Sequence, residues 1–383
     1  MIQTENVTNK SKPKIIWLNS LVFSITFVIA VIGVSLYAYI YGYDAATISG
    51  FIIATGYCGM SITAGYHRLW SHRAYETNSI IRFIFAIGGA FAVQNSALHW
   101  CSDHRVHHKH VDDNDVDPYS AKRGFWYSHI GWMLREYQAH RYYDYNNVRD
   151  LQRDKIVMWQ HKYYLTLVLT TNFGFPLLFG FINGNILGSL LLIGFMRLVI
   201  SHHVTFFINS LAHMWGKQPY NDQNTAKDNP IVALLTYGEG YHNFHHAFQS
   251  DYRNAIKWWQ FDPTKWFIKS LNWIGLANNL KQVSEHKISL AIACQEYNKT
   301  QSLLMALSLP DKDAILQSLQ NEYEQLQKKM LAFYQIKKQR LELAKNKMIE
   351  SVDASIILKQ YGELKQSLFK QQQSWQYLIQ QYA

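Results

Sequence analysis

Residues 103–108 read DHRVHH and carry three histidines, His104, His107 and His108, at spacings i, i+3 and i+4. If this stretch is helical, the three imidazoles lie on one face, because residues three and four apart are neighbours on a helix surface. Three neutral nitrogen ligands would then converge on one point. A single triplet also fits chance, a zinc site or a structural cluster, so its meaning depends on the rest of the chain.

Three further segments add histidines in related patterns. Residues 242–246, HNFHH, repeat the spacing of the first triplet. Residues 67–72, HRLWSH, hold two histidines five apart, too far round a regular helix to share a face, so we expect them at a helix end where the chain bends. Residues 209–213, NSLAH, place an amide and an imidazole at i and i+4 at the foot of a helix. The candidate ligands are His67, His72, His104, His107, His108, His213, His242, His245 and His246, a number that suits two metal ions better than one.

The order of these motifs resembles that of a known family. HRLWSH, HRVHH, NSLAH and HNFHH are similar to the motifs of the membrane-bound acyl-CoA desaturases of the stearoyl-CoA or delta-9 type, over roughly residues 15–282. The resemblance implies oxygen-dependent conversion of a saturated long-chain acyl-CoA to a cis-monounsaturated chain. It also implies two iron ions (Fe²⁺/Fe³⁺) on the nine histidines, a metal-bound water held by Asn209, and an external electron donor, either a b-type cytochrome or a ferredoxin with its reductase.

The residue types agree with a redox metal without proving one. Imidazole suits iron, zinc, copper and nickel alike, but zinc has no redox chemistry and a structural zinc site closes at four ligands. The Glu-x-x-His pattern of ferritin-like diiron proteins does not accompany these triplets. The nearby carboxylates of Asp103, Asp113, Asp115 and Glu239 are therefore expected to orient ligand histidines through their free ring nitrogens.

Four apolar runs, at about 15–40, 47–66, 163–182 and 186–208, approach or exceed the roughly 20 residues that span a bilayer. Residues 79–98 are also apolar, but a crossing there would separate His72 from His104, so we expect an interfacial or re-entrant helix. Neither tight turn, 42–46 or 183–185, contains Lys or Arg. The positive-inside rule then predicts a multi-pass protein with both termini and all nine histidines in the cytoplasm.

The predicted fold is all-α. A four-transmembrane-helix desaturase domain, residues 1–282, carries a cytoplasmic helical cap at 67–162 and 209–282 that holds the diiron site. Residues 283–383 are rich in Gln, Lys and Leu. Two heptad-like runs in this part predict a coiled-coil-like helical hairpin of unknown role. We expect these helices either to stabilise the protein as an appendage or to join homo-oligomers. Of the possible membranes, we favour the bacterial inner membrane over the endoplasmic reticulum.

Charge and cysteine content narrow the partners. The net charge is +10, but the basic residues do not gather on one recognition helix, which argues against nucleic acid and favours the lipid bilayer, a phosphate-bearing substrate and an acidic electron donor. The three cysteines have neither disulfide nor iron–sulfur spacing, so the electrons must come from another protein. Residues 252–279 interleave tryptophan with lysine, which suits a helix among lipid headgroups or, equally, a cap over the metal site.

The substrate contacts are less defined. Selectivity for one carbon pair requires a buried acyl tunnel that positions the chain, and we expect its far end between the helices of the first hairpin, near Phe51 and Thr55, although either could be an ordinary packing residue. Trp100, Asp103 and Arg135 are further candidate contacts.

One departure from the family leaves the acyl carrier open. Ser102 precedes Asp103 where CoA-dependent animal members carry Arg. CoA is our first choice, with acyl carrier protein or intact phospholipid as alternatives. A membrane diiron hydroxylase of acyl chains or alkanes is the competing enzyme. A non-enzymatic membrane metal-binding protein is the third reading, which the apolar first hairpin disfavours.

Overall fold

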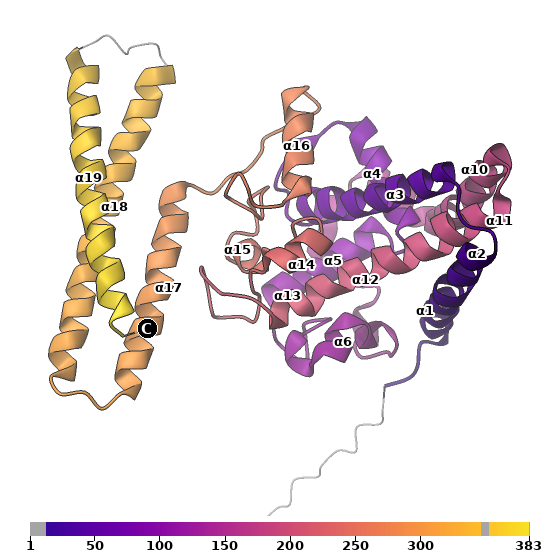
Figure 1. Ribbon diagram of the computed structural model, residues 1–383, viewed down its shortest axis with the longest axis horizontal. Coiled ribbons are helices and arrows are strands. Elements are labelled where there is room, and N and C mark those ends of the chain that lie inside the picture. The colour runs from indigo at the N-terminus through magenta and orange to yellow at the C-terminus, as the bar shows by residue number, and fades with distance from the viewer. Residues whose placement is uncertain (1–12, 346–351, 383) are drawn as a thin grey trace, which may run out of the picture. The chain divides into compact units, whose positions relative to one another are not determined.

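The protein is described by a computed structural model that covers residues 13–345 and 352–382. The chain forms two compact units: unit 1 holds the residues up to Lys217 together with Asn224–Gln282, and unit 2 holds Gln218–Gln223 and the residues from Val283 onward. Helices dominate both units in the described part of the chain (Figure 1). The predicted all-α class is confirmed.

Among the residues that the structure describes, four helical segments of unit 1 are long and apolar enough to cross a membrane, as predicted. They begin and end at Trp17–Ile40, Ala45–Ser71, Tyr164–Asn183 and Ile186–Met214, and we call them spans 1 to 4. Their parts are α1 (Trp17–Val28), η1 (Ile29–Gly33) and α2 (Val34–Ile40); α3 (Ala45–Met60) and η2 (Ser61–Ser71); α9 (Tyr164–Leu169), η7 (Thr170–Gly174) and α10 (Phe175–Asn183); and α11 (Ile186–Ser189), η8 (Leu190–Met196), α12 (Arg197–Asn209) and α13 (Leu211–Met214).

The turns of the two hairpins are joined by one carboxylate. Asp44 caps α3 by accepting a hydrogen bond from the backbone N–H of Thr47 at 2.8 Å. The same carboxylate accepts from Nδ2 of Asn183 and Nδ2 of Asn185, each at 2.9 Å. Spans 2 and 4 also pack along α3 and α12, which run side by side in Figure 1. These contacts fix the spans that lead into the histidine motifs.

The apolar stretch after span 2 does not cross. It forms α4 (Ser79–Phe91), whose 13 residues measure about 20 Å, short of a hydrocarbon core of about 30 Å. Nη1 of Arg197 in span 4 donates to the carbonyl of Phe91 at 2.7 Å, where α4 ends. Ser96 then caps α5 (Ala97–Lys109), which carries the first triplet back to the side of His67.

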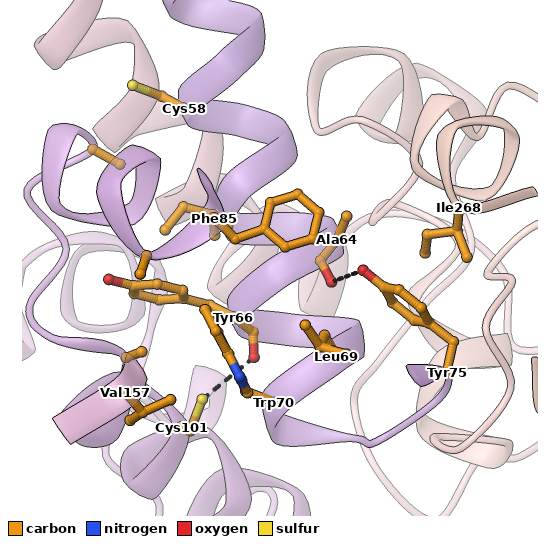
Figure 2. Packing of buried hydrophobic residues seen from close by; sticks show 14 of the residues in the cluster. Cys58, Ala64, Tyr66, Leu69, Trp70, Tyr75, Phe85, Cys101, Val157 and Ile268 are labelled. Carbon is orange, nitrogen blue, oxygen red and sulfur yellow. Dashed lines mark hydrogen bonds between the residues drawn. The ribbon is translucent and has the colours of Figure 1, made fainter. Parts of the chain in front are cut away.

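Short elements complete unit 1. A two-stranded antiparallel sheet joins β1 (Glu76–Thr77) to β2 (Ala277–Asn278). The hydrophobic core of unit 1 lies around η2, where Tyr66, Tyr75 and Ile268 are buried (Figure 2). The other elements are η3 (Ala121–Arg123), α6 (Phe125–His129), η4 (Gly131–Met133), η5 (Ala139–Arg141), η6 (Asn146–Val148), α7 (Arg149–Gln152), α8 (Lys155–Lys162), α14 (Pro230–Leu235), α15 (His242–Ala247) and α16 (Pro263–Trp273).

Unit 2 contains three long helices, α17 (Glu285–Ala306), α18 (Lys312–Lys345) and α19 (Val352–Gln380). The hairpin predicted from the heptad runs corresponds to α18 and α19, and α17 packs against both. Trp375 is buried in their shared core, and its indole N–H donates to the carboxylate of Glu296 on α17 at 2.7 Å. The heptad pattern missed α17, because its apolar residues are spread around the helix and show little periodicity.

Candidate metal centre

The site begins where span 2 changes its winding. Over η2 the helix is a π-helix, and the backbone N–H of His72 donates to the carbonyl of His67 at 3.1 Å. A π-helical turn joins residues five apart, so these two side chains line up, with ring centroids 4.7 Å apart. We expected this pair at a helix end where the chain bends; the helix widens over the pair and ends at Ser71, directly before His72.

The nine predicted ligands fall into two groups. In each group, one potential ligand atom per residue lies within 4.8 Å of all the others. We name them cluster A and cluster B; cluster A holds His67, His72, His104, His108 and His245, and cluster B holds His107, His213, His242 and His246. The clusters adjoin, since the rings of His108 and His246 stack with centroids 4.3 Å apart.

The three histidines of each triplet do not converge on one metal position, which differs from the expectation drawn from their spacing. His104 and His108 lie in cluster A while His107 lies in cluster B. The cause is helix geometry: at 100° per residue, positions i and i+4 are about 40° apart, whereas i+3 and i+4 are about 100° apart. The i, i+4 pair therefore shares a cluster and the residue between them turns to the other.

The donor sets fit metal ions. The Nε2 atoms of His72 and His104 are 2.8 Å apart, and those of His67 and His245 are 3.0 Å apart. Metal–imidazole bonds measure about 2.0–2.1 Å, so two ligands at right angles around one ion lie about 3 Å apart. In cluster B, Nε2 of His107 is buried without a hydrogen-bond partner. Convergent nitrogens at this separation and one orphaned ring nitrogen are what a metal ligand set requires.

Burial favours the neutral form of most of these imidazoles. It lowers the pKa of His72, His104, His108, His245 and His246 well below the usual value, and the charges of neighbouring imidazoles lower it further. The same causes lower the pKa of His242 to about 3. Metal binding requires the neutral imidazole, so these six histidines are ready to bind at neutral pH.

Carboxylates orient three of the ligands from behind. Nδ1 of His67 lies 2.9 Å from Oε2 of Glu239, as predicted for that glutamate. Nδ1 of His107 lies 2.9 Å from Oδ1 of Asp117, which is fully buried. Such partners fix the tautomer and the orientation of a ligand ring.

The third support is a relay through a hydroxyl. Nδ1 of His213 lies 2.9 Å from Oγ1 of Thr225, whose hydroxyl donates to the carboxylate of Asp112 at 2.6 Å. Sequence spacing had pointed to Asp103 and Asp113 instead. Asp103 pairs with His99 at 3.4 Å, and Asp113 accepts from the backbone N–H of Asp115. These carboxylates serve local structure.

The remaining candidate contacts are dispersed. Trp100 stacks on His104, with centroids 4.8 Å apart and ring planes 22° apart, so it borders cluster A. Nη1 of Arg135 donates to the carbonyl of Pro13 at 2.9 Å, which ties the start of the described chain to the loop after η4. Asn209 is half-buried at the end of α12, four residues before His213.

A cavity lies one helical turn from the clusters. It is a small pocket of about 10 Å³ between spans 2 and 4, lined by Thr55, Gly59, Thr63, Thr205, Ile208 and Tyr237, among others. Gly59 admits the ring of Tyr237, since a Cβ there would lie 2.4 Å from it. The tunnel end was expected between spans 1 and 2; Thr55 lines this cavity, but Phe51 packs against the core beside it.

Comparison with known proteins agrees with this architecture. Residues 45–271, which hold all nine histidines, match the fatty acid desaturase family. The chain belongs to this family. It is 46% identical over 252 residues to acyl-CoA desaturase 1 of Saccharomyces cerevisiae, a match that covers 66% of this chain and 49% of that protein. The chain therefore spans about half the length of that relative.

Other members of the family differ in what their names describe. Stearoyl-CoA desaturase 5 of Homo sapiens is 40% identical over 236 residues, covering 60% of this chain and 70% of that protein. The sn-2 palmitoyl-lipid 9-desaturase of Nostoc is 32% identical over 280 residues, covering 70% and 92% respectively. The family thus includes proteins named for acyl-CoA and for lipid-linked acyl chains.

Proposed function

We propose that this protein is an oxygen-dependent desaturase that converts a saturated long-chain acyl-CoA to a cis-monounsaturated chain, with carbon nine as the expected position. The observation that carries the proposal is the pair of adjoining histidine clusters at the end of a cavity between membrane spans. A metal-binding set of histidines at the end of apolar membrane spans suits an oxidation performed on a long alkyl chain.

The metal we propose is iron, one ion in each cluster. Bound iron supplies the redox chemistry that activates dioxygen. The chain's own part is to hold nine imidazoles in place, to keep the free ring nitrogens of His67, His107 and His213 next to Glu239, Asp117 and Thr225, and to offer Asn209 as the holder of a water molecule. The ligands of each cluster come from several segments of the chain, so the site depends on the complete unit 1.

The cavity supports the positioning of the alkyl chain. Each part of its wall leads into the metal centre: Thr63 precedes His67 by one turn of span 2, and Ile208 directly precedes Asn209 on span 4. Positioning of this kind lowers a reaction barrier by restricting the reacting atoms to one geometry.

Electron counting requires a donor. Reduction of O₂ to two waters takes four electrons; the alkyl chain provides two as it becomes an alkene, and a second protein provides the other two. Unit 2 contains one histidine, His286, and one cysteine, Cys294. It therefore lacks a histidine pair for a b-type haem and the four cysteines of a ferredoxin cluster. We propose the external donor that the resemblance implies, a b-type cytochrome or a ferredoxin with its reductase.

CoA is the proposed carrier. Ser102, at the position where the resemblance would place an arginine, is buried and its hydroxyl donates to Oδ1 of Asn147 at 2.8 Å, so it stabilises the loop after α5. A thioester head group would have to bind elsewhere on this side.

We further propose that both termini face the cytoplasm, that 1–282 and 283–383 are separate domains, and that the membrane is the bacterial inner membrane.

The test uses desaturase-deficient cells that express the chain or its His107→Ala variant. Total fatty acids are analysed by gas chromatography with mass spectrometry, and the double bonds are located. A new monounsaturated acid that disappears in the variant is the expected result. A hydroxylated acid would identify a hydroxylase instead. Cells that contain iron-loaded protein and a competent donor yet make no new lipid would refute the proposal.

A further inference from the structure

Large apolar side chains lie exposed on two elements beside the metal centre. On α14, Ile231, Leu234 and Leu235 are 48–60% exposed. In residues 257–274, Trp258 and Trp273 are 87% and 76% exposed, and Trp259, Trp266 and Ile274 accompany them. We call these two sets together the α14–α16 face. Exposed tryptophan at this density within residues 258–273 needs an explanation, because isolated apolar residues are common on surfaces but clustered ones mark interaction sites.

The contacts of this face set its level along span 2. The Thr264 hydroxyl at the start of α16 is 2.8 Å from that of Thr63, and the Tyr237 hydroxyl, two residues after α14, donates to the carbonyl of Thr55 at 3.3 Å. Span 2 is about 40 Å long, some 10 Å more than a hydrocarbon core of about 30 Å. Counted from Ala45, the core ends near residue 65. Both contacts therefore lie on the hydrocarbon side of this boundary.

Helix α16 has two distinct sides. Thr264, Ile268 and Leu271 are buried, at spacings i, i+4 and i+7, and Ile268 faces Tyr75 in the core (Figure 2). Trp266 and Trp273 are exposed on another side and are seven residues apart. Residues at this spacing share one face of a helix. The segment is thus both a cap over the core and an outward-facing apolar surface.

We propose that the α14–α16 face enters the bilayer interface on the side of the metal centre and binds anionic phospholipid there. The occupant follows from continuity, since the four spans already cross the same bilayer and the face begins at its boundary. Tryptophan is the residue that prefers this boundary. Lys257, whose ammonium lies 5.3 Å from the ring centre of Trp259, and Lys269 add positive charge for lipid phosphates.

Lipid contact here would reach the metal ligands through one buried network. Asp262 caps α16 and accepts from both Nη atoms of Arg68, at 3.2 and 3.0 Å. Arg68 adjoins His67, and Glu239 contacts both His67 and Arg68. Seating α16 in the interface therefore holds in place the groups that orient His67. The spans alone would leave this cap anchored only from its inner side.

The experiment measures depth with a fluorescent probe at single cysteines. Cys58 and Cys101 are buried, so a Cys294→Ser background confines labelling to introduced sites. The test sites are Trp273→Cys and Leu234→Cys. Ile53→Cys, 71% exposed on span 2, is the lipid-facing reference, and Tyr143→Cys, 88% exposed in the loop after η5, is the aqueous reference. Each labelled protein is placed in vesicles of phosphatidylcholine and phosphatidylglycerol containing nitroxide-labelled lipid.

The expected result is quenching at 273 and 234 of the same order as at 53 and several-fold above that at 143. Quenching at 273 and 234 as weak as at 143, with 53 fully quenched, would overturn the proposal and assign the face to a protein partner. Replacing phosphatidylglycerol by phosphatidylcholine should weaken quenching at 273, and this effect should disappear in Lys257→Gln/Lys269→Gln. Equal quenching in both lipids would refute the anionic preference.

Discussion

Replacing Glu239 by Gln tests whether a buried carboxylate holds the first metal ligand. Glu239 is 1% exposed and contacts Nδ1 of His67, the guanidinium of Arg68 and Nδ2 of Asn254, the last at 2.6 Å. The substitution keeps the shape of the side chain and removes its charge. His67 would then lose its anionic acceptor, and Arg68 would keep the carboxylate of Asp262 and the carbonyl of Tyr252.

Two magnitudes follow from the structure. Burial opposes ionisation of Glu239, but the charges of His67 and Arg68 prevail and lower its pKa from 4.5 to about 2, which corresponds to about 3 kcal/mol in favour of the charged form. Breaking a buried ion pair costs a similar amount, about 3–5 kcal/mol. Loss of a partner behind a ligand histidine lowers metal affinity by roughly 10–100-fold.

The assay separates orientation from simple stability. Metal content per chain is measured by mass spectrometry after dialysis against a graded chelator series, and unfolding is followed by circular dichroism. Asp262→Asn is the matched control, because Asp262 pairs with Arg68 without contacting His67. We expect both variants to be destabilised and Glu239→Gln to lose metal at a clearly lower chelator concentration than Asp262→Asn. Equal metal retention in the two variants would refute the orienting role of Glu239.

Four further outcomes are expected. His245→Ala and His213→Ala should each lower bound iron from two ions toward one, since they belong to different clusters; loss of both ions in each single variant would show that the clusters bind cooperatively. Burial and the charge of His203 lower the pKa of His129 from 6.5 to about 4, so only the unfolded state gains a proton as the pH falls below 6.5. About 2 kcal/mol of stability should therefore be lost at pH 5. His129→Gln should flatten this pH dependence in thermal scans; an unchanged dependence would mean that His129 is protonated in the folded state. Trp375→Ala should destabilise unit 2 by about 3–5 kcal/mol while iron content stays unchanged, whereas loss of iron would mean that the two units fold as one. Thr55→Trp should shift the product acids to shorter chains in the fatty-acid analysis, and an unchanged chain length would remove Thr55 from the tunnel.

Periodicity and spacing were enough to predict the spans and to collect the ligands. The four apolar runs predicted the transmembrane helices to within a few residues at most ends, and the motifs contained all nine histidines that the structure gathers. The carboxylate partners were harder to foresee. Asp117 lies ten residues after His107, and Asp112 acts through Thr225, so only the folded loop brings them to their histidines.

The winding of span 2 was also out of reach. Two histidines five residues apart have no shared face on an α-helix, and only the π-helical stretch η2 aligns them. Local sequence gives little sign of such a stretch, because its cost is offset by tertiary contacts around Tyr66 and Arg68, both buried. A widened turn at a functional site is therefore an effect of packing that spacing rules cannot predict.

Each histidine triplet contributes ligands to both clusters, and this explains why the site depends on the whole of unit 1. Helix α5 gives an i, i+4 pair to cluster A and His107 to cluster B, while α15 gives His242 and His246 to cluster B and His245 to cluster A. Neither cluster can be completed by one helix, so α5 and α15 must dock before either binds an ion. Metal binding then contributes directly to the stability of that docking, because ions bind the assembled ligand set far more tightly than the unfolded chain.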